Sequence, residues 1–361
     1  MNEQLIVGTK KGLLVFQKKG ASYELKASHF IGIPVTAFLN DDRNNTWWCG
    51  LNHGHWGVKL HKSIDQGKKW EAVKVPSFPE GTDYKEGIPA TVKDIFCIQK
   101  GGEVEPDVLW IGTRPGALFK STDQGESFQL NEALWNLPSR TDPNQWFGGG
   151  WDEPIIHSIE LHPKNAQHIY LGLSVAGVFE SLDGGTSWSP KNKGSLAGFL
   201  PDPTVAIGHD PHRLLICRNH PDVLWQQNHC GVFRTENAAA DWIPSSKADE
   251  VAHFGFAIAI DHDLPNEAWI VPAISDEIRV ANDQKLRVYY TSDGGKNWTS
   301  RSEGLPEDPA FDLVYRHAFD KRKDELAFGT TTGNLYLSMD RALHWNVISN
   351  NIPPVNVICF I

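Results

Sequence analysis

One short pattern, Ser/Thr-x-Asp-x-Gly-x-x-Trp/Phe, recurs along the chain and constrains its fold more than any other feature. Clear copies begin at Ser63, Ser121, Ser181 and Thr291, and altered copies, with Asn for Asp or Ala for Gly, begin at Thr235 and Ser338. The spacing between copies runs from 47 residues (291 to 338) to 60 residues (121 to 181). Such a nearly constant period indicates an array of equivalent structural units rather than unrelated domains.

The residue types of the motif suit a tight turn between two strands. Asp and Ser side chains accept hydrogen bonds from nearby backbone amides in turns. Gly supplies the positive φ that such a turn often requires, and the final aromatic residue packs over the hairpin. We therefore assign the motif aspartates a structural role rather than a catalytic one.

The arrangement of apolar segments predicts how many units the chain contains. A strand, a Gly-containing turn and a second strand recur before the motifs, as in residues 109–119 and 169–179. Upstream of the hairpins lie apolar segments that we expect to be innermost strands: 34–39, 93–99, 156–162, 213–218, 255–261, 312–319 and 355–361.

The two ends of the chain carry complementary incomplete units. The hairpin at 5–16 has no innermost strand before it, whereas the segment 355–361 has no hairpin after it. We predict that 355–361 completes the blade begun by 4–28, since this closes the ring and leaves no open sheet edge. The predicted fold is all-β: a single seven-bladed β-propeller domain over 1–361, with velcro closure by the C-terminal strand.

The motif, its period and the seven units resemble the Asp-box (BNR-repeat) β-propeller superfamily. Within it, the chain is most similar to uncharacterised bacterial sialidase-like, BNR-repeat glycosyl hydrolase-like proteins, through segments such as 149–154, 225–231, 254–256 and 315–317. The resemblance covers essentially the whole chain. It implies the fold more firmly than an activity, because one fold hosts many functions.

Composition excludes some classes of function. The net charge of −10 argues against nucleic-acid binding, which normally requires a basic face. No leader-like N-terminal segment and no apolar run of about 18 residues is present, so we expect neither secretion nor a membrane span. Five cysteines without a CxxC pair favour reduced thiols and a cytoplasmic location.

Long insertions identify the face on which a ligand site is expected. In a four-stranded blade with strands A to D from the centre outward, the D-to-A and B-to-C connections share one face, and the motif turns lie on the other. The insertions at about 73–93, 129–155, 189–212 and 274–287 belong to the first face. Connections of this length usually serve a function.

Acidic residues on this face are the candidate catalytic groups. Hydrolysis of a glycosidic bond needs two carboxyl groups, and the candidates are Asp152 with Glu153, and Asp276 with Glu277. His157, at the start of an innermost strand, is a candidate proton carrier. The alternative is that the acids are solvated loop residues, with a local ion pair to Arg279.

Aromatic and basic residues on the same face are the candidate ligand-binding groups. We expect Trp151, His212, His229, Arg279, Arg316 and His317 to contact a small polar or carbohydrate-like ligand, with the arginines recognising an anionic group. The sequence leaves open whether a metal or other cofactor binds. Sialidases use three arginines, but no Phe-Arg-Ile-Pro motif is present, so we do not expect true sialidase activity.

Two functions therefore follow from the sequence. The first is a glycoside hydrolase-like enzyme that acts on a small polar or anionic ligand at the loop-bearing face. The alternative is a non-catalytic propeller that binds a protein partner or a metabolite there. A funnel of converging polar groups favours the first, and a flat apolar surface favours the second.

Overall fold

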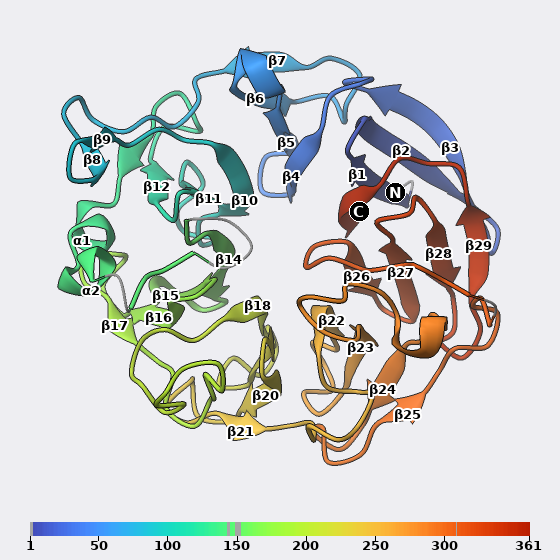
Figure 1. Cartoon of the computed structure of the whole chain (residues 1–361). Coiled ribbons are helices and arrows are strands. Elements are labelled where there is room, and N and C mark those ends of the chain that lie inside the picture. The colour runs from blue at the N-terminus through green and yellow to red at the C-terminus, as the bar shows by residue number, and fades with distance from the viewer. Residues whose placement is uncertain (1–2, 143–144, 149–152, 308) are drawn as a thin grey trace. The chain divides into compact units, whose positions relative to one another are not determined.

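The computed structural model describes residues 3–142, 145–148, 153–307 and 309–361. Seven four-stranded antiparallel sheets form the blades of a seven-bladed β-propeller, as predicted from the repeats (Figure 1). The chain divides into two compact units: a first unit of residues 1–35 and 217–361, and a second unit of residues 36–216. The prediction of a single domain over 1–361 remains a prediction.

The strands of the first unit belong to four blades. They are β1 (Gln4–Thr9), β2 (Gly12–Lys19), β3 (Ser22–His29) and β30 (Val355–Phe360); β19 (Leu224–Asn228), β20 (Gly231–Thr235) and β21 (Ile243–Pro244); β22 (Gly255–Ile260), β23 (Ala268–Pro272), β24 (Tyr289–Thr291) and β25 (Thr299–Ser300); and β26 (Phe319–Arg322), β27 (Glu325–Gly329), β28 (Leu335–Ser338) and β29 (Asn346–Ser349). A short 3-10 helix, η2 (Asn282–Gln284), lies between β23 and β24.

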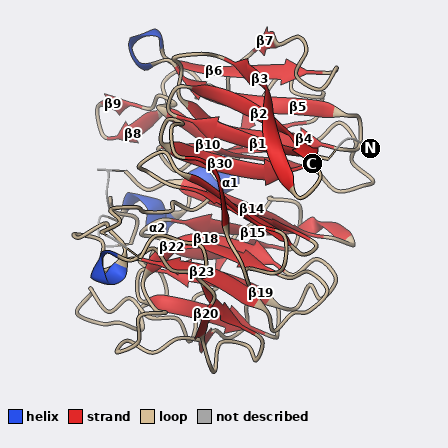
Figure 2. Cartoon of the chain, turned by 90° about the vertical axis from the view of Figure 1, so that its right-hand side faces the viewer, coloured by secondary structure: helices blue, strands red, loops and turns tan. Residues whose placement is uncertain are grey.

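The second unit contains the remaining strands. They are β4 (Val35–Asp41), β5 (Thr46–Asn52), β6 (Val58–Ser63) and β7 (Glu71–Val73); β10 (Asp94–Lys100), β11 (Leu109–Arg114), β12 (Leu118–Ser121) and β13 (Gln129–Leu130); β14 (Ile156–His162), β15 (Asn165–Leu173), β16 (Gly177–Ser181) and β17 (Ser189–Pro190); β18 (Pro211–Ile216); and the hairpin of β8 (Asp83–Lys85) and β9 (Ile88–Pro89). The helices are η1 (Gly54–Trp56), α1 (Glu132–Trp135) and α2 (Pro138–Thr141). Strands predominate throughout (Figure 2), and no helix in the described ranges could span a bilayer.

Strand β30 completes the blade that begins at the N-terminus. It pairs antiparallel with β1, with Leu5 opposite Phe360 and Val7 opposite Ile358. Backbone bonds from Gln4 N to Ile361 O (2.8 Å) and from Ile361 N to Gln4 O (2.9 Å) extend the ladder. The sheet order β3-β2-β1-β30 therefore confirms the predicted velcro closure.

All six motif copies form the same turn. The hydroxyl of the first residue donates to the side-chain oxygen of the third, which also accepts from the amide of the seventh, at 2.7 to 3.0 Å. The fifth residue has a φ between 60° and 89°, even where it is Ala239 or Ala342. The local hydrogen bonds therefore hold the turn in a conformation that favours glycine.

Three motif tryptophans tie neighbouring blades together within the units. The indole Nε1 of Trp188 donates to Asn131 Oδ1 (3.0 Å), which follows β13. Trp298 Nε1 donates to Ser245 O (2.7 Å) just after β21, and Trp345 Nε1 to Arg301 O (2.9 Å) just after β25. Each indole therefore binds the residue that follows the outermost strand of the preceding blade.

One predicted innermost strand is displaced. The segment 312–319 was expected to be a strand, but β26 covers only Phe319–Arg322, and residues 311–318 form part of the connection before it. Leu313 and Val314 are buried without forming a ladder, and a turn from Ala318 N to Tyr315 O (2.7 Å) precedes β26. The apolar run was mistaken for a strand because burial of a connection produces the same sequence signal.

Candidate functional site

Three connections of the first unit lie on its loop-bearing face. They are the D-to-A connections before β22 and before β26, and the B-to-C connection between β23 and β24. Because Arg316 and His317 precede β26 rather than lie within it, they belong to this face by the alternation of strand direction. Arg316 and His317 had been expected within the innermost strand 312–319, whereas the structure places them in the connection before β26.

Aromatic rings from two of these connections, from the start of β22 and from the turn between β19 and β20 form a continuous cluster. Phe254 contacts Phe256 edge to face, with ring centroids 5.4 Å apart and planes at 83°. Phe256 in turn contacts Tyr315 (5.2 Å, 71°), and His229 contacts Phe254 (5.6 Å, 83°). We call these four rings, together with Arg279 and Arg316, the Phe256 cluster.

Two guanidinium groups lie beside the central ring of the cluster. The Cζ atoms of Arg279 and Arg316 are 5.6 Å and 5.7 Å from the centroid of Phe256. Such cation–π contacts hold planar guanidinium groups in place while their N–H groups remain able to bind a carboxylate in a bidentate manner. The cluster can therefore recognise a planar anion next to an apolar wall.

A compact turn presents Arg279. Ile278 N donates to Ser275 Oγ (2.9 Å), Ile274 N donates to Val280 O (3.0 Å), and Arg279 Nε donates to the backbone oxygen of Asp276 (2.7 Å). Arg279 is exposed, as are Asp276 and Glu277 on the same turn. The contact of Arg279 with Asp276 thus involves a neutral carbonyl, whereas the sequence had suggested an ion pair with the carboxylate.

The predicted catalytic residues of the second unit are buried and partnered. Glu153 is only 6% exposed and forms an ion pair with Lys93. The imidazole of His157, in β14, is fully buried, with Nδ1 2.9 Å from Ser158 Oγ. Trp151 and Asp152 lie outside the described residues.

Further polar residues lie near the predicted ones in the second unit. Arg114 Nε and Nη2 lie 2.8 and 2.7 Å from Asp94 Oδ2, and Asn52 Nδ2 also donates to Asp94. His212, in β18, has its Nε2 3.4 Å from Asp210 Oδ2, and Val175 N donates to Asp210 Oδ1. Imidazole and carboxylate are common metal ligands, but the question of a metal, left open by the sequence, stays open.

His317 contributes to the fold through its backbone. Its carbonyl oxygen accepts from Ile358 N at 2.8 Å, which ties the connection before β26 to the closing strand β30. The side chain of His317 is half-buried. The structure thus gives a definite structural role to this residue, and its predicted ligand-binding role is untested.

Phe254, Phe256 and Tyr315 were absent from the predicted ligand-binding residues. Phe254 and Phe256 flank the start of β22, where apolar residues are ordinarily attributed to the core. The alternation Phe254-Gly-Phe256 places both rings on the same side of the chain, which was the available signal for an aromatic wall.

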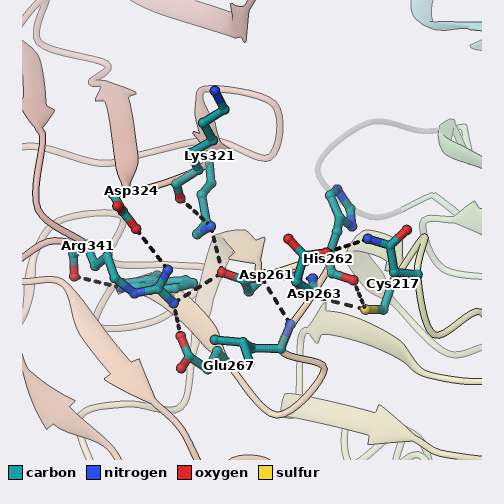
Figure 3. A network of polar contacts seen from close by, with 12 residues as sticks. Cys217, Asp261, His262, Asp263, Glu267, Lys321, Asp324 and Arg341 are labelled. Carbon is teal, nitrogen blue, oxygen red and sulfur yellow. Dashed lines mark hydrogen bonds and ion pairs between the residues drawn. The ribbon is translucent and has the colours of Figure 1, made fainter.

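A second polar network lies in the first unit, where the A-to-B turn after β22 meets Lys321 of β26 and the motif turn that contains Arg341 (Figure 3). Lys321 Nζ and Arg341 Nη2 lie 2.8 and 3.1 Å from Asp261 Oδ2, and Arg341 also pairs with Glu267. Both cations lie 5.3 Å from the ring of Trp269. Here the carboxylates of buried Asp261 and half-buried Glu267 match the cations, so we assign the network a structural role.

The pKa values of Asp261 and His262, both in or beside this network, are shifted well below their usual values. Burial alone would raise the pKa of Asp261, but the hydrogen bond from Lys321 and backbone donors lower it to about 2. Burial, with the nearby charges of Arg218 and Lys321, lowers the pKa of His262 to about 4. At neutral pH, Asp261 is therefore ionised and His262 is neutral.

Comparisons with known proteins establish the fold. No protein-family model and no curated protein matches the chain. Similar solved structures include the GH74 enzyme of Niastella koreensis (TM-score 0.60, 16% identity, covering 94% of this chain and 53% of that one) and an ancestral GH74 enzyme (0.58, 16%, 91% and 38%). YCF48 bound to D1 peptide is also similar (0.55, 14%, 92% and 88%).

These comparisons differ in how much of each relative is matched. The chain spans about half of the Niastella koreensis enzyme and less of the ancestral one, but most of the YCF48 structure. At these identities the similarity concerns the seven-bladed propeller alone. The fold is thus shared by carbohydrate-active enzymes and by a protein that binds a peptide.

Proposed function

We propose that the loop-bearing face of the first unit binds a small hydroxylated ligand that carries a carboxylate or a similar anionic group. The observation that carries this proposal is the position of Arg279 and Arg316, whose guanidinium groups lie within 6 Å of the same Phe256 ring. Guanidinium groups recognise carboxylates by paired hydrogen bonds, and aromatic side chains provide a wall for the less polar part of a ligand.

A comparison with the Trp269 network supports an anionic ligand. At Trp269, two cations beside one ring are matched by Asp261 and Glu267. At Phe256, the hydrogen bond of Arg279 goes to a neutral backbone oxygen. The positive charge of Arg279 is therefore available to an anion supplied by a ligand.

Binding of acidic sugars tests the proposal. We would titrate the protein with galacturonate and glucuronate, using galactose and glucose as neutral counterparts, and measure heat of binding. We expect measurable binding of a uronate, with at least tenfold weaker binding of its neutral counterpart. The Arg279→Gln and Arg316→Gln variants should each lose about tenfold or more in affinity, the scale of one charge-assisted hydrogen bond.

Arg287→Gln is a matched control, because Arg287 lies on the same B-to-C excursion but pairs with Asp283 (3.4 Å). This variant should bind like the wild-type protein. Equal affinity for acidic and neutral sugars, or an equal loss in all three variants, would contradict the anionic-ligand proposal.

Glycoside hydrolysis is a second candidate function, favoured by the similarity to GH74 enzymes and by the exposed carboxyl groups of Asp276 and Glu277 on the turn that carries Arg279. Release of a fluorescent alcohol from 4-methylumbelliferyl glycosides would measure it. Asp276→Asn and Glu277→Gln should then abolish turnover and leave uronate binding intact. Binding without turnover in the wild-type protein would favour the non-catalytic alternative, in which the face holds a metabolite or a protein partner.

A further inference from the structure

A cavity of about 350 Å³ lies in the second unit, within the connection of residues 191–210 between β17 and β18. Ser195, Leu196, Val205 and Ala206 are among the residues that line it. Neither the repeat motif nor the proposed ligand site uses this connection. The cavity borders a buried pair of side chains whose chemistry is distinctive.

Ser195 and His209 form that pair. Ser195 Oγ lies 3.0 Å from His209 Nδ1, and His209 Nε2 lies 2.6 Å from the backbone oxygen of Val205. A carbonyl oxygen can only accept, so Nε2 carries the proton and Nδ1 presents its lone pair to the serine hydroxyl. The arrangement of hydroxyl, imidazole and orienting acceptor is the one that activates a nucleophilic serine.

The connection holds this arrangement firmly. Asn192 Oδ1 accepts from Val178 N (2.8 Å), and Asn192 Nδ2 donates to Ala206 O (2.9 Å). Ser195 N donates to Asn192 O (3.0 Å), and His209 forms a bridge with Ala176. Asn192 O also lies 2.8 Å from Ser195 Oγ, so it competes with His209 Nδ1 for the single hydroxyl proton, and attack requires the rotamer that donates to His209. The serine and the histidine are thus fixed by bonds to separate parts of the blade.

The surroundings suit an apolar substrate. Leu196 and Phe199 are each 39% exposed, and Phe199 contacts Phe147 with ring centroids 6.3 Å apart. Burial lowers the pKa of His209, opposed by the carbonyl groups of Val205 and Leu196. The imidazole is therefore neutral at neutral pH, as a general base must be.

We propose that Ser195 is a nucleophile, with His209 as its general base, and that the cavity takes a small carboxylic ester with an apolar acyl group. Ser195 Oγ bonds to the acyl carbon while its proton passes to His209 Nδ1. The ester C–O bond then breaks, and the departing alcohol oxygen takes that proton. Water, deprotonated by the same nitrogen, releases the carboxylic acid and restores Ser195.

The chain contains a matched control pair. Ser246 Oγ lies 2.9 Å from His253 Nδ1, but this oxygen also accepts a hydrogen bond from Val232 N at 2.9 Å. Ser246 is not among the residues that line the cavity, and we assign it no nucleophilic role. The Ser246→Ala variant is the control: it shows whether the reagent labels any serine that lies next to a histidine, or Ser195 alone.

The experiment is labelling of the folded, full-length protein with a small alkyl fluorophosphonate, followed by peptide mapping. We expect one adduct, on Ser195, which is lost in Ser195→Ala and retained in Ser246→Ala. His209→Gln should slow labelling at least about 100-fold, the usual contribution of a general base. The rate of p-nitrophenyl butyrate hydrolysis should fall in the same variants, Ser195→Ala and His209→Gln, and be unchanged in Ser246→Ala.

Mapping of the wild-type protein keeps the test independent of whether any variant folds. Thermal unfolding of each variant shows whether its loss of labelling reflects a loss of fold. An unlabelled Ser195 in the folded wild-type protein under excess reagent would overturn the proposal. Labelling that survives Ser195→Ala, or that is unchanged by a folded His209→Gln variant, would overturn it equally.

Discussion

Lys321 Nζ lies 2.8 Å from Asp261 Oδ2, and both side chains are less than 8% exposed. Removal of one partner from such a buried pair leaves an uncompensated charge. We expect Asp261→Asn to reduce the free energy of unfolding by about 3 kcal/mol at pH 7, at the lower end of the range for buried pairs. Urea denaturation measures this change.

We also expect the stability that this pair provides to depend on pH. The pKa of Asp261 is about 2 in the folded protein, below the roughly 3.9 of an unfolded chain. The contribution of Asp261 to the free energy of unfolding is therefore fully present above about pH 4 and is lost as the pH falls toward 2. A difference in stability between wild type and Asp261→Asn that is constant from pH 7 to pH 2 would contradict this assignment.

His262 should affect stability in a different pH window. Its pKa is about 4 in the folded protein, against roughly 6.5 in an unfolded chain. Folding favours the neutral ring, so its contribution is fully present above about pH 6.5 and declines as the pH falls toward 4. We expect His262→Gln to flatten the pH dependence of the unfolding free energy between these values.

His344 provides a control with the opposite sign. Its hydrogen bond to Asp340 raises its pKa, so its contribution is present below about pH 6.5 and is lost at higher pH. His344→Gln should therefore leave the decline below pH 6.5 in place. If His262→Gln and His344→Gln alter the pH profile alike, burial of His262 is not the cause.

The closing strand should be indispensable. Deletion of residues 355–361 removes Val355, Ile358 and Phe360 from the core and leaves the inner edge of β1 without its partner. We expect loss of the cooperative unfolding transition, or aggregation through the open edge. Leu25→Ala is the control in the same blade: Leu25 of β3 is 55% exposed, so this variant should change the free energy of unfolding by less than about 0.5 kcal/mol.

The motif glycine at Gly125 should resist substitution for two separable reasons. Its φ is 80°, and an added Cβ would lie 2.4 Å from Cη2 of the buried Trp48. We expect Gly125→Ala to cost about 2–4 kcal/mol, from backbone strain together with overpacking. Gly20→Ala isolates the strain, because Gly20 has a φ of 62° and no atom within 4 Å, and should cost about 1 kcal/mol. If chemical denaturation shows that both variants lose the same free energy of unfolding, the Trp48 side chain moves aside without destabilising the protein.

Most of the fold could be predicted because its signals are local. The hydrogen bonds of Asp123 go to residues of its own turn, Ser121, Glu126 and Ser127, so the motif carries its own turn geometry, and repetition supplies the number of blades. The segment 312–319 was mispredicted because Leu313 and Val314 are buried in a connection. Burial leaves the same apolar pattern whether or not a strand forms.

The site was less predictable because it depends on contacts between distant segments. Strand alternation placed Arg279 on the loop-bearing face, whereas Arg316 fell within the predicted strand 312–319. Their meeting at Phe256 depends on the conformation of two long connections. The pairing of Ser195 with His209 was missed altogether. It arises inside an irregular connection, where no periodicity relates the two positions.

The pairing of β1 with β30 also sets an order of events during synthesis. A ribosome releases Leu5 early and Phe360 some 355 residues later (360 minus 5), so the first blade has an unpaired inner strand for most of translation. At about 5–20 residues per second, that interval is of the order of 20–70 seconds. Chaperones that shield exposed strands therefore have a long interval in which to act on β1.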